Sequence, residues 1–285
     1  QPAAGDAGGA LGAAQWMWHQ VLDKPRRPAY PDAMQGSFLG TDIPPSSEEH
    51  DRLLKSLGAV WESYDDEALA RKIAAAISEG KVIAVARGKM EWGPRALGTR
   101  SILGDARLPH MQSHMNLKIK FRESFRPFAP MVLAEDADKY FNITHESPYM
   151  LLVFDVEESL RTPVENQKLF GIDLLKLKRS EIPAITHVDY SARVQTVDRA
   201  RNPFIWSVLR EFRGLTGCSV IINTSFNIRG EPIVNTVKDA YRCFMATEID
   251  CLVAGNRFME REKQNHRPMT PEERQKWLQS FERDE

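Results

Sequence analysis

The sequence predicts an α/β protein built on a twisted sheet, and three successions of helix and strand carry this prediction. In the first, Leu69, Ile73 and Ile77 recur at four-residue spacing and Gly80 offers a helix stop before an apolar strand. The other two repeat this order with similar lengths. The successions are 65–79 then 82–86, 203–215 then 219–222, and 237–247 then 250–254.

The remaining elements are predicted from composition and capping patterns. An Ala-rich helix is expected at Ala10–Leu22, and Ser46–Glu49 resembles a helix start with early acidic residues. A further strand is expected at Met150–Val156. Residues 24–46, rich in Pro and Gly, are interpreted as a connection. The charged C-terminal segment is expected to form a surface helix whose capped start is at Thr270–Glu273.

Bulk properties exclude several function classes. The chain has 285 residues and a formal net charge of −1, which argues against a general nucleic-acid binder. Its three cysteines lie in apolar segments and are expected to be reduced thiols of a cytoplasmic protein. No apolar run suggests a membrane span or signal peptide. Because the first residue is not Met, we expect a fragment, a processed product or one half of a split enzyme.

The segment from Lys81 to Arg126 contains the clearest candidate for a binding site, because its lysines and arginines lie among glycines and prolines. Arginine offers fixed forks of donors and glycine lets backbone N–H groups approach an anion. A phosphate or carboxylate site is therefore predicted, with an ordinary basic surface as the alternative. The cations are Lys81, Arg87, Lys89, Arg95, Arg100, Lys118, Lys120, Arg122 and Arg126.

Two later motifs add polar side chains. In residues 221–234 an apolar strand ends in Asn223, Ser225 and Asn227, where ligands gather in open α/β sheets. The alternative is a polar turn that caps the next helix. In residues 187–197 polar side chains alternate, so a strand there would present five of them on one face. That face would either line a polar cavity or be the solvent-exposed face of an edge strand.

These motifs together resemble the NodU-type O-carbamoyltransferases, the family that carbamoylates nodulation factors, aminoglycosides and cephamycins. Residues 90–103 (Met-Glu-Trp-Gly-Pro-Arg-Ala-Leu-Gly-Thr-Arg-Ser-Ile-Leu) are similar to one family block, and 116–130 to the next. Residues 187–197 and 223–234 are similar to the following two, with Tyr190 at a place where a small residue is expected. The resemblance runs from Pro2 to about Asn256.

The resemblance implies a YrdC-like fold, a twisted mixed sheet with helices and a basic concave face. It also implies formation of carbamoyl-AMP from carbamoyl phosphate and ATP, with Mg²⁺ accompanying ATP. The family's K-x-R and S-x-N signatures correspond to residues 120–122 and 225–227. The catalytic residues are expected to be Lys120, Arg122 and Arg95. The binding residues are expected to be Arg100, Arg126, Asn116, Arg193, Asn223, Ser225 and Asn227.

At the front of the chain, residues 2–14 resemble the end of the family's N-terminal actin-like transfer domain. Asp6 resembles the last carboxylate ligand of that domain's iron, and the other ligands are expected upstream of this chain. The expected organisation is a domain remnant at 1–24, a connection at 25–64, the YrdC-like domain at 65–258 and a charged tail at 259–285.

Two alternatives to this function stay open at this point. A threonylcarbamoyl-adenylate synthase would use the same fold with threonine and bicarbonate, and a non-catalytic module would bind nucleotide without turnover. The expected partners are carbamoyl phosphate, ATP and, in the complete enzyme, a hydroxylated small-molecule acceptor. The sequence does not identify that acceptor.

Overall fold

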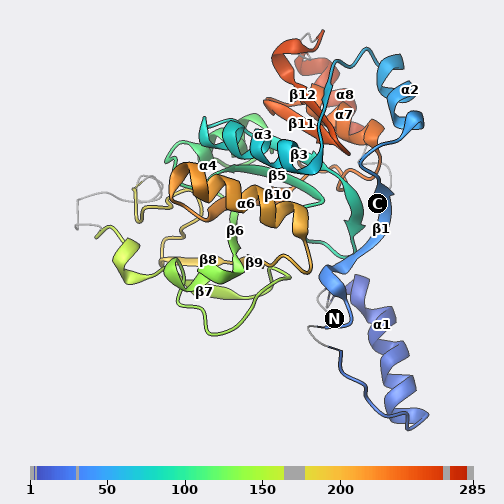
Figure 1. Ribbon diagram of the computed structural model, residues 1–285, viewed down its shortest axis with the longest axis vertical. Helices are drawn as coiled ribbons and strands as arrows, with labels where there is room; N and C mark the ends of the chain where they lie inside the picture. Colours follow the sequence, from blue (N-terminus) through green and yellow to red (C-terminus); the bar gives the residue numbers. More distant parts are fainter. Residues whose placement is uncertain (1–2, 4, 30–31, 164–176, 266–269, 281–285) are drawn as a thin grey trace.

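A mixed sheet of eight strands forms the centre of the computed structural model, which describes residues 3, 5–29, 32–163, 177–265 and 270–280 (Figure 1). The pairs β11–β3 and β6–β9 are parallel, and the other neighbours are antiparallel. In spatial order the strands are β2 (Glu62–Ser63), β12 (Arg257–Glu260), β11 (Cys251–Ala254), β3 (Ile83–Ala86), β5 (Arg100–Asp105), β10 (Val220–Ser225), β6 (Ala129–Leu133) and β9 (Gln195–Val197).

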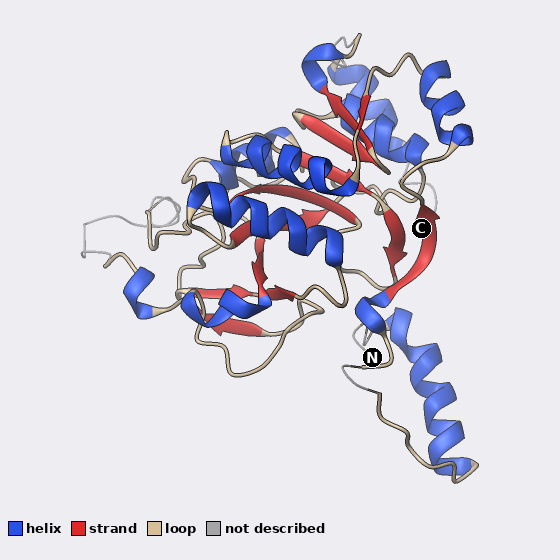
Figure 2. Ribbon diagram, in the orientation of Figure 1, coloured by secondary structure: helices blue, strands red, loops and turns tan. Residues whose placement is uncertain are grey.

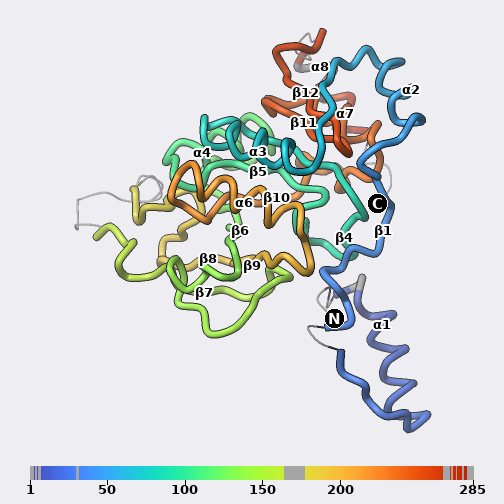
Figure 3. The backbone as a smooth tube through the Cα atoms, in the orientation of Figure 1, coloured from blue at the N-terminus to red at the C-terminus, as the bar shows by residue number. Residues whose placement is uncertain are grey.

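Two small antiparallel sheets flank the central one. Strand β1 (Phe38–Ile43) pairs with β4 (Gly88–Glu91), and β7 (Val153–Asp155) pairs with β8 (Ser191–Arg193). Figure 3 shows how the chain runs from α1, below the body in this view, through β1 to α2 beside α7. The β1–β4 pair therefore ties the N-terminal segment to the body of the protein.

Helices α3 and α6 lie side by side over the central sheet, while α7 packs against β11 and β3 (Figure 2). None of the described helices is long and apolar enough to cross a membrane. The helices are α1 (Asp6–Trp16) with a π-helical continuation (Met17–Val21), α2 (Glu48–Ser56), α3 (Asp66–Ser78), α4 (Met111–Lys118), α6 (Pro203–Thr216), α7 (Val237–Ala246) and α8 (Pro271–Gln279), and the 3-10 turns are Gln35–Ser37, Ala134–Lys139, Glu158–Leu160 and Arg261–Lys263.

Side-chain caps explain where the main helices begin. Ser47, Asp65 and Asn202 each accept a hydrogen bond from a backbone N–H in the first turn of the helix that follows. Thr236 and Asp239 form a reciprocal capping box at the start of α7. The predicted helices at 65–79, 203–215 and 237–247 are confirmed, as is the helix start near Ser47.

The strands were predicted less completely. Those at 82–86, 219–222 and 250–254 are confirmed as β3, β10 and β11, whereas 150–156 forms only the three-residue β7. Residues 187–197, considered above as a possible strand, do not form one continuous strand. Residues 187–190 turn, because Tyr190 adopts a φ of +63° and Asp189 Oδ1 accepts hydrogen bonds from the N–H and hydroxyl of Ser191. Two short strands, β8 and β9, follow the turn.

A buried carboxylate shapes the loop between β4 and β5. Glu91 Oε1 accepts hydrogen bonds from the backbone N–H groups of Leu97 and Thr99, both at 2.7 Å. Between these two residues Gly98 has a φ of +121°, and a Cβ there would lie 2.7 Å from Ile205 Cγ1. Both the conformation and the contact require glycine.

We therefore expect Gly98→Ala to lower the free energy of unfolding by about 3 kcal/mol, through backbone strain and overpacking. Gly214, in α6, is the matched control because a Cβ there meets nothing within 4 Å. Gly214→Ala should raise stability by about 0.5–1 kcal/mol. Urea unfolding of both variants measures the difference, and equal midpoints for Gly98→Ala and the wild type would show that the loop accepts a side chain.

Candidate functional site

The ammonium group of Lys120 joins two of the sequence motifs at the centre of the candidate site. Lys120 follows the end of α4, and its side chain is only 5% exposed. Its Nζ donates to the backbone oxygens of Ser225 and Asn227 at 2.8 Å each. Asn227 Oδ1 lies at 2.7 Å and Ser225 Oγ at 3.3 Å. Four acceptors therefore surround three N–H donors.

The acceptors belong to a closed turn at the end of β10. Ser225 Oγ donates to Asn227 Oδ1 at 2.7 Å, and Asn227 Nδ2 donates to the backbone oxygen of Glu231 at 2.7 Å. Glu231 is itself buried, and its Oε2 accepts from the N–H of Ile228 at 3.0 Å. The side chains of Ser225, Asn227 and Glu231 are thus all hydrogen-bonded, which holds the turn around Lys120.

Burial changes the ionisation of the groups around this turn. Loss of solvent, followed by the charge of Arg122, lowers the pKa of Lys120 to about 7. Burial, followed by the charge of Arg126, lowers the pKa of Arg122 to about 10. Burial raises the pKa of Glu231 and holds the pKa of the Cys243 thiol well above its usual range. Lys120 therefore changes charge near neutral pH.

Asn116 positions the arginine that follows Lys120. Its Oδ1 accepts from Arg122 Nε at 2.6 Å, and its Nδ2 donates to the backbone oxygens of Ser124 and Arg126. The Arg122 guanidinium also lies 4.9 Å from the centre of the Phe128 ring, a cation–π distance. Asn116 is fully buried, so it holds the loop and Arg122 in place.

Two adjoining hollows open beside Lys120, and together we call them the cationic cleft. One of about 260 Å³ is lined by Lys120, Ser225, Asn227 and three arginines, among other residues. The other, of about 570 Å³, is lined by four arginines together with Asn223 and Ser225. The hollows share Arg122, Arg126 and Ser225. The arginines of the cleft are Arg95, Arg122, Arg126, Arg193 and Arg229.

Two residues that line the larger hollow each have a buried polar atom without a partner in the described part of the chain. These are Arg193 Nε and Asn223 Oδ1. Asn223 Nδ2 is already used, because it donates to Ala96 O and Gln195 Oε1. Burial, followed by the charge of Arg95, lowers the pKa of Arg193. Unpaired buried polar atoms are costly, so the protein itself leaves the residues around this hollow incompletely satisfied.

Nine of the predicted site residues are thus brought together, eight of them lining the cleft and Asn116 supporting it. Arg100 lies elsewhere. It is fully buried in β5 and donates to the backbone oxygens of Gly88, Thr99, Thr41 and Asn235, contacts that favour a structural role. His187 and Phe128 also line the cleft. From the sequence, His187 was considered only as one of five alternating polar side chains that could line a cavity, and Phe128 was given no role.

The iron ligand predicted from the sequence is Asp6, whose side chain lies outside the described part of the structure; its backbone begins α1. Within the described residues, no group of three or more His, Cys, Asp or Glu side chains has a metal-binding arrangement. Among the described residues that line the cleft, Glu123 is the only one with a carboxylate. A single carboxylate is too few ligands to hold a metal ion.

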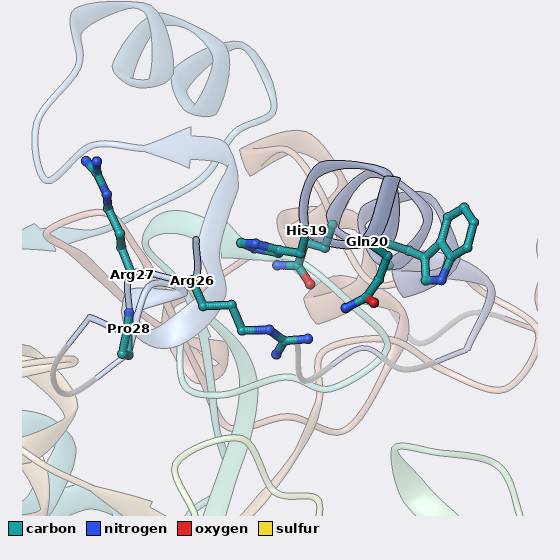
Figure 4. A pocket seen from close by; sticks show the side chains of 8 residues that line it. His19, Gln20, Arg26, Arg27 and Pro28 are labelled. Atoms are coloured by element: carbon teal, nitrogen blue, oxygen red, sulfur yellow. The ribbon is translucent and has the colours of Figure 1, made fainter. Parts of the chain in front are cut away.

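A separate hollow of about 540 Å³ lies between α1 with its π-helical continuation and residues 26–28. Figure 4 shows Arg26 reaching toward the helix that carries His19 and Gln20, whereas Arg27 points away. His19 Nδ1 lies 2.8 Å from the backbone oxygen of Lys24. This hollow shares no lining residue with the cationic cleft.

Comparisons with known proteins show which family this chain belongs to. A family model described as "Carbamoyltransferase C-terminus" matches residues 74–261, which include the Lys120 and Ser225 segments. The chain is 54% identical over its whole length to the Uncharacterized protein sll1178 of Synechocystis sp., covering 46% of that protein. It is 39% identical to the Nodulation protein NolNO of Sinorhizobium fredii, over 90% of the chain and 35% of the relative.

A third relative has an activity in its name. The chain is 34% identical to the 3'-hydroxymethylcephem-O-carbamoyltransferase of Streptomyces clavuligerus, over 71% of the chain and 34% of that protein. The chain spans a third to a half of the length of these three relatives. The family model covers more than half of the chain, and the four motifs of the sequence agree with it. The protein therefore belongs to the carbamoyltransferase family, and residues 74–261 are its C-terminal family region.

Proposed function

We propose that this chain forms carbamoyl-AMP from carbamoyl phosphate and ATP, as the activating part of an O-carbamoyltransferase. The observation that carries the proposal is the buried Lys120 beside a cleft with five arginines, inside the region matched by the family model. The central mixed sheet is compatible with the YrdC-like fold that the sequence resembles.

The reaction requires cationic groups that bind two phosphate compounds, and the arginines of the cleft are such groups. Carbamoyl phosphate, ATP and water would give carbamoyl-AMP, phosphate and pyrophosphate. Water cleaves carbamoyl phosphate to carbamate and phosphate, and a carbamate oxygen then attacks the α-phosphorus of ATP as its bond to pyrophosphate breaks. Two polyanions must be held together against their mutual repulsion, and the charge on each departing group must be stabilised.

The cleft residues divide this work by position. Arg122 and Arg126 line both hollows, so they can contact an anion in either one. Arg95 and Arg193 line the larger hollow, so their guanidinium groups can contact an anion there. Ser225 and Asn227 hold Lys120 at the wall of the smaller hollow, and Ser225 also lines the larger one. Arginine forks suit phosphate oxygens geometrically.

Metals enter this proposal in two different ways. Mg²⁺ would arrive on the phosphates of ATP, since the cleft presents mainly cations and only Glu123 as a carboxylate. The iron implied by the family resemblance finds no ligand cluster among the described residues, so no step is derived through it. Transfer of the carbamoyl group to a hydroxyl is proposed for the longer protein, on the strength of the cephem relative's name.

ATP–pyrophosphate exchange tests the proposal directly. The 285-residue chain is incubated with ATP and labelled pyrophosphate, either with carbamoyl phosphate or with threonine and bicarbonate. Exchange that depends on carbamoyl phosphate supports the proposed function. Exchange that depends on threonine and bicarbonate identifies a threonylcarbamoyl-adenylate synthase instead. ATP binding without exchange under either condition would leave a non-catalytic nucleotide-binding module and overturn the proposal.

Lys120→Ala and Arg122→Ala should each reduce this exchange about a hundredfold or more, because each removes a charge-assisted contact from a poorly solvated site. Lys118 provides the matched control. It lies two residues earlier and pairs on the surface with Glu248 at 3.2 Å, so Lys118→Ala should keep normal exchange. Circular dichroism and thermal unfolding establish that the variants are folded. Near-normal exchange in the folded Lys120 and Arg122 variants would remove both residues from the mechanism.

The lowered pKa of Lys120 predicts proton uptake on ligand binding. With a pKa of about 7, Lys120 is mostly neutral at pH 8, and a bound polyanion raises the pKa by favouring the ammonium form. Binding of ATP at pH 8 should therefore take up close to one proton, about 0.8 if the pKa rises above about 9. Calorimetric titration in buffers of different ionisation enthalpy measures this number.

Lys120→Arg is the control for this titration, because arginine is already charged at pH 8. Uptake should disappear in that variant even where ATP still binds. It should also decline in the wild type at pH 6, where Lys120 is already protonated. Equal uptake by the wild type and Lys120→Arg at pH 8 would assign the proton to another group.

A further inference from the structure

The loop that carries Arg95 is held by side chains from distant parts of the chain. This loop joins β4 to β5, and Arg95 lines the larger hollow of the cleft. The backbone oxygen of Ala96 accepts a hydrogen bond from Asn223 Nδ2 at 2.8 Å. The backbone oxygen of Leu97 accepts one from Gln195 Nε2 at 2.9 Å. These two contacts fix the backbone directly after Arg95, because they hold two successive peptide groups.

Gln195 joins the two contacts into one network. Its Oε1 accepts from Asn223 Nδ2 at 2.8 Å, while its Nε2 donates to the Leu97 oxygen. The two amides lie on β9 and β10, and β6 runs between these strands in the sheet. Both side chains are buried. A reversed Gln195 amide would set donor against donor and acceptor against acceptor, so the network allows only one orientation.

The Gln195 side chain itself lines neither hollow of the cationic cleft. Its contacts are with the Arg95 loop and with Asn223, so any effect on a bound anion passes through these groups. Glu91 accepts from the N–H of the same Leu97 at 2.7 Å, which leaves this residue held at both its N–H and its oxygen. Gln195 and Glu91 therefore hold the loop from two different sheets.

We propose that Gln195 is a positioning residue, which holds the Arg95 loop so that Arg95 contacts an anion together with Arg122 and Arg126. All three arginines line the larger hollow. The assignment rests on the proposed function, because it takes Arg95 as an anion-binding residue. An amide suits this role, since it supplies one donor and one acceptor without a charge that would compete with the anion for the arginines.

The test measures pyrophosphate affinity by calorimetry in two variants of neighbouring β9 residues. Gln195→Met removes both amide contacts with little change in side-chain length, and it should weaken pyrophosphate binding about tenfold. Thr196→Val is the matched control. Thr196 is buried, its Oγ1 accepts from the N–H of Ser147 at 2.9 Å, and it lines neither hollow of the cleft. This control loses a buried hydrogen bond from the same strand, yet its pyrophosphate affinity should stay within about twofold of the wild type.

A double-mutant cycle separates positioning from a general effect on the fold. In an Arg95→Ala background, Gln195→Met should change pyrophosphate affinity by less than about twofold, because the group that it positions is gone. A tenfold effect that persists in this background would show that Gln195 acts independently of Arg95. Equal weakening by Gln195→Met and Thr196→Val would show general damage to β9. Either result overturns the assignment, as does wild-type affinity in folded Gln195→Met.

Pyrophosphate is the probe because its binding requires no turnover. If the wild type binds pyrophosphate but shows no exchange that depends on carbamoyl phosphate, the proposed function fails, and the affinities of the Gln195 variants still decide the assignment. If exchange occurs, Gln195→Met should reduce it in the wild-type background and have little further effect in Arg95→Ala. Thermal unfolding establishes that each variant is folded at the assay temperature. Failure of the wild type to bind pyrophosphate would overturn both proposals.

Discussion

The buried ammonium of Lys120 is the contact on which the geometry of the cleft depends. It connects the segment after α4 to the end of β10, which lie more than a hundred residues apart in the sequence. Desolvation opposes the charge, and the surrounding carbonyl, amide and hydroxyl oxygens offset that cost. Because Arg122 follows two residues later and Ser225 supplies an acceptor, this contact sets the spacing between the cations and the β10 turn.

Cationic side chains serve two opposite purposes in this protein. Arg100 and Arg257 are fully buried and donate hydrogen bonds within the protein. Arg100 donates to backbone oxygens, and Arg257 donates to backbone oxygens and to Asp51. Arg122, Arg126 and Arg193 line the cleft. The net charge of −1 does not reveal this cluster of arginines, because acidic side chains elsewhere in the chain balance the total charge. Local arrangement, more than composition, therefore determines what the surface attracts.

The sequence predicted the helices well because their apolar spacing and caps are local signals, as at Asp65 and Thr236. It missed β5 and β6. Strand β5 begins with a buried arginine, and β6 contains Pro130, which is usually an argument against an inner strand. The clustering of Lys120 with Ser225 and Asn227 was accessible through the family motifs. The role of Arg100 was not, since a sequence does not show whether a guanidinium meets solvent or buried carbonyls.

Strand β1 contacts both ends of the loop that carries Arg95. Phe38 pairs with Glu91, whose carboxylate organises the loop, and Thr41 O accepts from the Arg100 guanidinium where the loop ends. The loop that carries Arg95 at the edge of the cleft is thus held from both ends by a strand that precedes the region matched by the family model.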